Sequence, residues 1–190
     1  RWSASPEVAM GSLLNFIENQ RDDGSFAGHI YVNQLQENGF YHADWGRAVM
    51  ELYRVHPDRS FIERIYDPMK KYLGYFDRVR DREDCGLYDV VDQFETGQEY
   101  MSRYTVVDPM ADRYGWINSI RLKGVDATVY VYNLKKALAW MAGLLGLKEE
   151  RKLFEESATK TKKAVLELMW DDHEEIFSDV NPVDFKRTGV

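Results

Sequence analysis

Residues 126–146, DATVYVYNLKKALAWMAGLLG, hold the pattern that decides the fold. Apolar side chains recur here at helical spacing and form one broad stripe: Ala127, Tyr130, Val131, Leu134, Leu138, Met141 and Leu145. A stripe of this width predicts an amphipathic helix that buries one face. Gly146 follows directly, and glycine readily adopts the left-handed conformation in which helices end. The pattern therefore predicts a long helix that starts at Asp126 and stops at Gly146.

The next stretch repeats the helical spacing. It is marked by Leu153, Phe154, Ala158, Thr161, Val165, Leu168 and Met169. Only a few residues around Gly146 separate the two stripes, and so short a connection makes consecutive helices antiparallel neighbours. The two helices are therefore expected to form a hairpin.

The first helix of the chain is predicted from its start signals. Ser5 supplies an N-cap and Pro6 a first-turn proline, and the apolar residues that follow share one face as far as Gln20. Asp44 is expected to cap a second helix. The His-Pro pair at residues 56–57 should end it, because proline disfavours helical backbone in the residue before it.

A third upstream helix is expected to begin with a capping box formed by Ser60 and Glu63. Pro68 lies inside its pattern, and proline removes one helical hydrogen bond and crowds the preceding turn. We therefore expect this helix to kink at Pro68 or to restart from Asp67. Helices joined by alternating long and short loops predict an all-α protein with one domain over residues 1–190.

The composition excludes several classes of protein. A formal net charge of −7 and a pI near 5.2 argue against nucleic-acid binding, which depends on Lys and Arg. The basic run at residues 160–163 lies in a helical pattern and is expected to be a solvated face. No apolar run approaches the ~18 residues that cross a bilayer, so no membrane partner is expected. Cys85 is the one cysteine, and the four histidines show no paired spacing, so neither a metal nor a cofactor is expected.

Two long polar loops, residues 21–43 and 80–98, are the places where we expect function, because long loops in compact domains tend to carry it. The second leads into residues 95–104, ETGQEYMSRY, which bring carboxylates, a glycine, an arginine and aromatic rings together. Aromatic residues make up 14% of the chain, and such rings serve both a helical core and the stacking of sugar rings.

Glu95 and Glu99 suggest glycoside hydrolysis, which needs one carboxylic acid to protonate the leaving oxygen and one carboxylate to activate water or attack. On a continuous helix they would point the same way with Cβ atoms ~5–6 Å apart, leaving little room for substrate between them. We therefore assign the proton donor to Glu99, and to Glu95 a role in fixing the loop or binding a sugar hydroxyl. Arg103 is expected to steer Glu99 or hold a substrate oxygen, and Gln98 to bind substrate. A surface salt-bridge ladder is the alternative.

Residues 95–104 resemble the motif Glu-Ser/Thr-Gly-x-Asp, followed by an aromatic residue, Ser-Arg and a second aromatic residue, of trehalases and their relatives. These relatives are the processing α-glucosidases and the mannosylglycerate-hydrolase-like enzymes. A weaker likeness includes residues 124–138 and 169–180. The resemblance implies an (α/α)6 barrel, a toroid of antiparallel helical hairpins, and inversion of the anomeric centre. It also implies that the fifth motif position, Glu99, is the general acid, although the family usually has Asp there.

The resemblance further implies an incomplete barrel. In such enzymes the second catalytic carboxylate lies far downstream, so the base is expected outside this chain. The chain is then about half of the toroid, inactive alone, with the remainder of the barrel as its partner and an oligosaccharide or glycoside as substrate. His42, Asp44 and Trp45 are candidates for a sugar subsite. The alternative is that Asp44 is only an N-cap and Trp45 part of the core.

Two other interpretations stay open. One is a glycosidase of the same barrel that acts on another sugar, such as an arabinofuranosidase or a rhamnosidase. The other is a non-catalytic helical module that binds carbohydrate. Serine hydrolases and nucleotide enzymes are excluded, because the sequence has neither a Gly-x-Ser-x-Gly elbow nor a phosphate-binding glycine loop.

Overall fold

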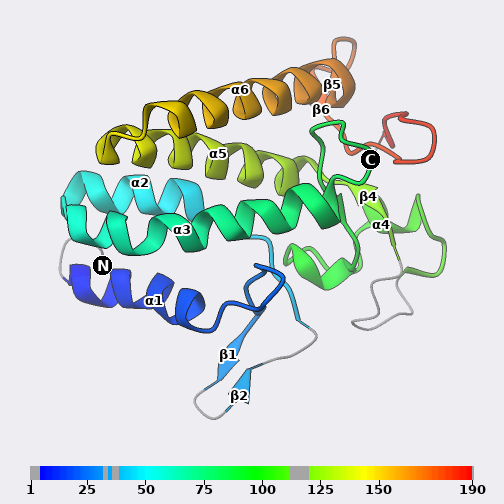
Figure 1. Cartoon of the computed structure of the whole chain (residues 1–190). Coiled ribbons are helices and arrows are strands. Elements are labelled where there is room, and N and C mark those ends of the chain that lie inside the picture. Colours follow the sequence, from blue (N-terminus) through cyan, green and yellow to red (C-terminus); the bar gives the residue numbers. More distant parts are fainter. Residues whose placement is uncertain (1–4, 32–33, 36–38, 112–119, 190) are drawn as a thin grey trace.

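A computed structural model describes residues 5–31, 34–35, 39–111 and 120–189 (Figure 1). The long helices are α1 (Pro6–Glu18), α2 (Trp45–Val55), α3 (Arg59–Tyr75), α5 (Val125–Leu145) and α6 (Lys148–Ala164). The short helix α4 (Ser102–Thr105) includes the last residues of the motif segment, which is residues 95–104. Short antiparallel strand pairs complete the description: β1 (Ile30–Tyr31) with β2 (Gln34–Leu35), β3 (Asp89–Val90) with β4 (Leu122–Lys123), and β5 (Trp170–Asp171) with β6 (Ile176–Phe177).

The long helices pack in two layers. α5 contacts α2, α3 and α6, and α1 packs against α2 and α3 on the side away from α6 (Figure 1). α2 and α5 thus form one layer. The helices that flank it, α1, α3 and α6, form the second layer. The chain alternates between the two layers from one helix to the next. This is the arrangement of an (α/α) toroid, so the predicted all-α fold of helical hairpins is confirmed.

The core holds the layers together. Ile62, Ile65 and Met69 of α3 and Leu138 and Met141 of α5 belong to one apolar cluster, and each is 0% exposed. Burying a side chain of this size contributes roughly 1.5–3 kcal/mol. Because each helix has a more apolar face and a more polar face, this burial fixes which side of the helix points inward.

Two glycines explain how closely the helices approach. Gly146 ends α5 with φ +80°, and its neighbour Leu147 donates a hydrogen bond to the carbonyl of Ala142, which turns the chain back into α6. The predicted hairpin and its stop residue are confirmed. Gly46 of α2 lies directly against the backbone of Asn133 in α5, where a Cβ atom would meet that carbonyl oxygen at 2.5 Å.

The third helix differs from the prediction at its N-cap, and it does not restart at Asp67. Asp58, not Ser60, is its N-cap, because the Asp58 carboxylate accepts the N–H groups of Ser60 and Phe61. α3 also continues through Pro68. Residues on both sides of the proline are buried in the same core, and this packing outweighs the ~3 kcal/mol that an interior proline costs. A π-helical turn, Phe76–Arg80, then extends the helix.

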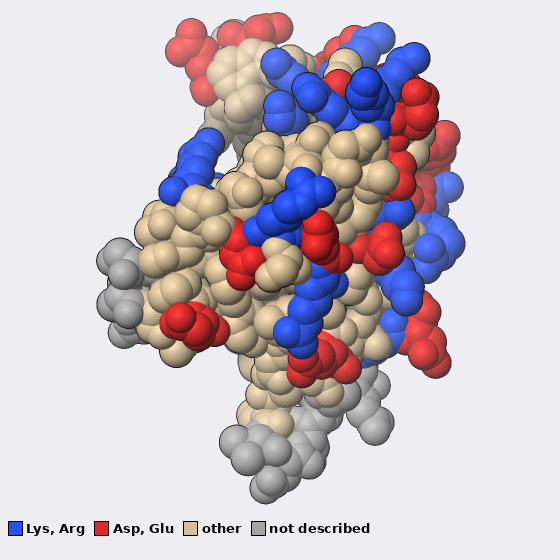
Figure 2. Space-filling model, turned by 60° about the vertical axis from the view of Figure 1, so that its left-hand side comes forward, with Lys and Arg blue, Asp and Glu red and all other residues tan. Residues whose placement is uncertain are grey.

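The surface agrees with the charge pattern of the sequence. Lys160, Lys162 and Lys163 are exposed on α6, while Thr161 between them is buried. Figure 2 shows basic and acidic side chains intermixed at the top of the molecule, where α6 lies. The predicted solvated face is therefore present. None of the described helices combines the length and apolar character needed to cross a membrane.

Candidate active site

The motif segment is an irregular loop and not a continuous helix. Asp92 accepts the N–H of Phe94 and so starts a single 3-10 turn, Gln93–Glu95. Gly97 then has φ +70° and Tyr100 φ +63°, and both values interrupt helical backbone. Glu95 and Glu99 consequently do not share a helix face, and the surface salt-bridge ladder is not formed.

Glu95 lies in the interior. It is 1% exposed, and its two carboxylate oxygens accept hydrogen bonds from Arg80 at 2.6 and 3.1 Å. Its Oε2 also accepts the N–H of Val91 at 3.0 Å. Burial raises the pKa of a carboxyl group, but the charge of Arg80 and the nearby His42 outweigh it and hold the pKa of Glu95 below its ordinary value. The structure thus engages Glu95 in fixing the loop.

His42 belongs to the same buried cluster. Its backbone N–H donates to the carbonyl of Glu95 at 2.8 Å, and its Nε2 lies 3.4 Å from Glu95 Oε2. Neither ring nitrogen has a well-formed hydrogen bond to the described residues. The ring packs edge-on against Phe40. With its side chain 0% exposed, His42 supports the loop from within.

Arg103 is fully engaged by two carboxylates. Its guanidinium forms paired hydrogen bonds with Asp179 at 2.7 and 2.9 Å and with Asp126 at 2.8 and 3.0 Å. Gln98 accepts a further hydrogen bond from Arg103 at 2.6 Å. This cluster ties the motif segment to the start of α5 and to the residues after β6. Since its donors are used in this way, Arg103 does not pair with Glu99.

The two aspartates differ in their pKa values. For Asp179, burial and the like charge of Asp126 raise the pKa against the opposing effect of Arg103. For Asp126, burial acts in the same direction, but hydrogen bonds and charge from Arg103 outweigh it and lower the pKa. One guanidinium therefore does not fully compensate both carboxylates.

Glu99 is the motif carboxyl group that these clusters leave out. It is partly exposed, and it forms no ion pair within the part of the chain that the structure describes. Burial, followed by the charge of Glu99, raises the pKa of Tyr41, so the Tyr41 hydroxyl lies within electrostatic range of Glu99. The Tyr41 ring meets His29 edge-on at 4.8 Å, and His29 stacks with Tyr31 at 5.9 Å. Tyr41 thus belongs to a group of aromatic rings in the 21–43 loop, and it is the member of that group on which the charge of Glu99 acts.

A groove with a volume of about 490 Å³ runs beside the motif. Its polar lining includes Gln98, Ser102, Arg103, Asp126 and Asp179. Its apolar lining includes Met101, Val129, Tyr130 and Phe177. Carboxylates and an amide next to apolar and aromatic surface suit a polar ligand with a hydrophobic face.

Asp44 and Trp45 have structural partners. Asp44 caps α2 by accepting the N–H of Arg47 at 3.0 Å, and it accepts a second hydrogen bond from Asn133 of α5 at 2.7 Å. The ring of Trp45 packs against Phe16 at 5.1 Å and Phe26 at 6.1 Å. These contacts match the N-cap and core alternative, while Asp44 also borders an open hollow on α2.

Several residues of this region were not predicted. Nothing in the sequence indicated that Arg80 belongs to the site, because an arginine in the last turn of a helix ordinarily interacts with the negative end of the helix dipole. Asp126 and Asp179 lie in the two stretches that resemble the family, and that likeness was the available signal. Tyr41 lies in a long loop expected to carry function, but nothing in the loop singled it out.

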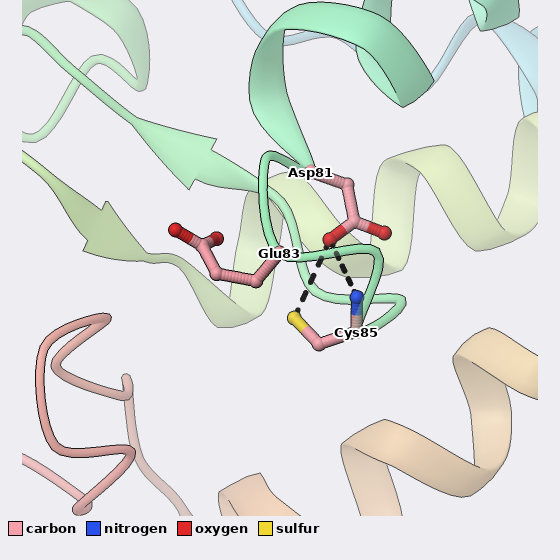
Figure 3. Close-up of side chains that lie close together, drawn as sticks. All are labelled: Asp81, Glu83 and Cys85. Atoms are coloured by element: carbon pink, nitrogen blue, oxygen red, sulfur yellow. Dashed lines mark hydrogen bonds between the residues drawn. The ribbon is translucent and has the colours of Figure 1, made fainter.

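One further group of side chains has the composition of a metal site. Asp81, Glu83 and Cys85 place ligand atoms within 4.8 Å of one another (Figure 3). The ammonium group of Lys123 already supplies a cation there, 2.7 Å from Glu83 and 3.0 Å from Asp89. Asp81 accepts the N–H groups of Cys85 and Gly86. Although burial opposes it, hydrogen bonding to Lys123 and Arg121 lowers the pKa of Glu83 to about 2. We interpret this group as a structural ion network.

Comparison with protein families gives one match over almost the whole chain. Residues 1–189 match the family model described as mannosylglycerate hydrolase MGH1-like glycoside hydrolase domain. The match includes the complete motif segment and both arginine clusters.

Solved structures show the same fold. An uncharacterized conserved protein from Thermus thermophilus superposes with a TM-score of 0.81 at 18% identity, covering 99% of this chain and 58% of that one. The GH63 mannosylglycerate hydrolase from Thermus thermophilus, in complex with Tris and D-glycerate, gives a TM-score of 0.79 at 18% identity. This match covers 99% of this chain and 60% of that one. The same enzyme in complex with glucose gives a TM-score of 0.77 at 16% identity and covers 99% of this chain and 58% of that one. The chain therefore spans somewhat more than half the length of these structures.

Proposed function

Because the chain belongs to the mannosylglycerate hydrolase MGH1-like glycoside hydrolase family, we propose that it supplies the proton donor of an inverting, exo-acting glycosidase. In this proposal Glu99 is the general acid, which protonates the glycosidic oxygen as the bond breaks. The general base, which activates water on the opposite face of the sugar, lies in the part of the barrel outside this chain.

The observation that supports Glu99 most directly is the division of charge within the motif. Glu95 forms an ion pair with Arg80, and Arg103 forms ion pairs with Asp126 and Asp179. Glu99 has no such arginine partner among the described residues, and a nearby arginine would favour its ionised form over the protonated form that a general acid needs. Its partial exposure also leaves it within reach of a bound ligand.

The aromatic rings of the 21–43 loop favour a sugar substrate. Tyr31 is 53% exposed on β1 and is joined through His29 to Tyr41, on which the charge of Glu99 acts. Flat amphipathic rings stack well on the apolar faces of pyranose rings. Gln98 lines the neighbouring groove and is proposed to contact substrate hydroxyls.

The substrate class is proposed from relatives. The solved structures named as mannosylglycerate hydrolase hold glucose in one complex and D-glycerate in another. We therefore expect a hexose linked to glycerate, or a related small glycoside. The remainder of the barrel is expected to close the site and to bring the base.

The test is hydrolysis by the full-length protein that contains these residues. A panel of mannosyl, glucosyl and rhamnosyl glycosides, including the glycerates, is incubated with wild type and with Glu99→Gln. General acid catalysis contributes about 10²–10⁴-fold, so the variant should lose turnover by that factor. Wild-type turnover by Glu99→Gln would remove Glu99 from the mechanism. Sugar binding without hydrolysis of any member by wild type would favour the binding module instead.

A further inference from the structure

We propose that Arg80 and Glu95 are positioning residues, which fix the backbone that carries Glu99. The inference rests on the proposed role of Glu99 as general acid. It gives the buried ion pair a function beyond stability, namely placing the carboxyl group of Glu99 relative to the bond that is cleaved.

Arg80 is held on every side. Its guanidinium lies over the rings of Phe40 at 4.9 Å and Tyr75 at 5.6 Å. Its Nε donates to the Tyr75 hydroxyl at 2.9 Å, and Nη1 donates to the carbonyl of Asp89 at 3.3 Å. Arg80 is 3% exposed. It therefore offers a rigid, planar pair of donors at the end of α3.

Glu95 transfers this rigidity to the motif. Its side chain receives both Arg80 donors and the N–H of Val91, and its carbonyl receives the N–H of His42. One residue thus joins the end of α3, the segment after β3 and the loop before α2. A planar two-point bond to an arginine defines orientation as well as distance.

Hydrogen bonds also hold residues between Glu95 and Glu99. Thr96 is hydrogen-bonded to the Tyr104 hydroxyl at 2.6 Å, and Gln98 is hydrogen-bonded to Arg103 at 2.6 Å. On the far side, the N–H of Tyr100 donates to Gln93 at 3.0 Å. The backbone at Glu99 is therefore held before and after, and the Arg80–Glu95 pair is its most deeply buried support.

Stability alone is a poor explanation for this pair. Desolvating two charges opposes folding, and apolar replacements of buried ion pairs are often equally stable. An apolar pair would, however, lose the directional bonds that orient Glu95. Small displacements of a catalytic group can cost about 10²-fold in rate. We therefore expect the pair to act on the rate by fixing the position of the motif.

The test compares substrates whose leaving groups need the proton to different extents. Mannosyl and glucosyl glycerates need protonation of the leaving oxygen, whereas mannosyl and glucosyl fluorides release fluoride with little help. In the full-length protein, Glu95→Gln should lower kcat on the glycerates roughly ten- to a hundredfold and leave kcat on the fluorides within about threefold. Glu99→Gln should show the same selectivity more strongly. Leu138→Ala, a core variant remote from the motif, should lower both activities equally.

The outcomes separate the two proposals. Equal losses on both substrates for Glu95→Gln, with a selective loss for Glu99→Gln, would overturn the positioning role only. Wild-type glycerate turnover by Glu99→Gln would overturn the proposed function itself. If Glu95→Gln does not fold, Arg80→Lys replaces it, since lysine keeps the charge but not the planar fork. The same selective loss is expected, and an equal loss would count against the pair.

Discussion

Two arginine clusters flank Glu99, and they balance charge differently. The Arg80 cluster pairs one guanidinium with one carboxylate, Glu95, in the interior. The Arg103 cluster pairs one guanidinium with two carboxylates, Asp126 and Asp179, at the edge of a groove. The first is formally neutral, and the second carries one net negative charge.

The difference shows in the acid–base behaviour of the carboxyl groups. Arg80 lowers the pKa of Glu95 although burial opposes it. In the second cluster, burial and the neighbouring Asp126 raise the pKa of Asp179 although Arg103 opposes them. Charge balance favours the neutral cluster in the interior, because an uncompensated charge there has little water to hydrate it. At the groove, solvent or a polar ligand can hydrate or bind the excess charge.

Breaking the interior pair should have the largest effect on stability. Arg80→Met leaves the Glu95 carboxylate buried without its cation, which typically costs about 3–5 kcal/mol. Urea denaturation of wild type and variant measures the loss. A loss below about 1 kcal/mol would mean that Glu95 is hydrated or protonated in the variant and that the interior is less closed than described.

A double variant sharpens this comparison. Arg80→Met combined with Glu95→Leu removes both charges and should recover most of the stability, since apolar replacements of buried pairs are often neutral. Turnover on glycerates should not recover with it, because the orientation of the motif is still lost. Recovery of both would assign the pair to stability alone.

The helical framework followed from the sequence because it depends on local signals. The helix and its stop at Gly146 are properties of neighbouring residues, and both are observed. The predicted stripe is buried at Ala127, Val131, Leu134, Leu138 and Met141, whereas Tyr130 and Leu145 are half-buried. The N-cap of α3 was mistaken because Asp58 and Ser60 carry equally good capping groups. α3 does not restart at Asp67, because packing of the residues around Pro68 is a tertiary effect that overrides local propensity.

The candidate site was less predictable for a physical reason. Its clusters join residues far apart in the chain, such as Arg103 with Asp179, and no spacing rule reports such pairs. Glu95 was expected to fix the loop or bind a hydroxyl, but its partner Arg80 was unknown from sequence. The role of Glu99 was assigned from the motif residues and supported by the resemblance, and it stays a prediction.

The pH dependence of stability should distinguish the two clusters next. The folded pKa of Glu95 lies below its ordinary value of 4.5, so its contribution is present above that pH and is lost as the pH falls through the folded pKa. The folded pKa of Asp179 lies above its ordinary value of 3.8, so relative stability increases as the pH falls through the folded pKa toward 3.8. Each effect involves one proton and is limited to about 1.4 kcal/mol per pH unit.

The measurement is urea unfolding from acid to neutral pH for wild type, Glu95→Gln and Asp179→Asn. The stability difference between wild type and Glu95→Gln should shrink as the pH falls. As the pH falls, the stability of wild type relative to Asp179→Asn should increase. Slopes of the same sign would show that the two clusters balance charge in the same way.

An exposed pair provides the lower limit of the comparison. Arg151 and Glu155 of α6 are 2.8 Å apart, but their side chains are 57% and 51% exposed. Water screens such a pair, so Glu155→Gln should cost about 0.3–0.5 kcal/mol in urea unfolding, and about 1 M salt should abolish most of it. A loss as large as that of Arg80→Met would mean that burial does not set the strength of ion pairs here. The contrast between the interior and the groove would then need another cause, such as the number of hydrogen bonds that each arginine makes.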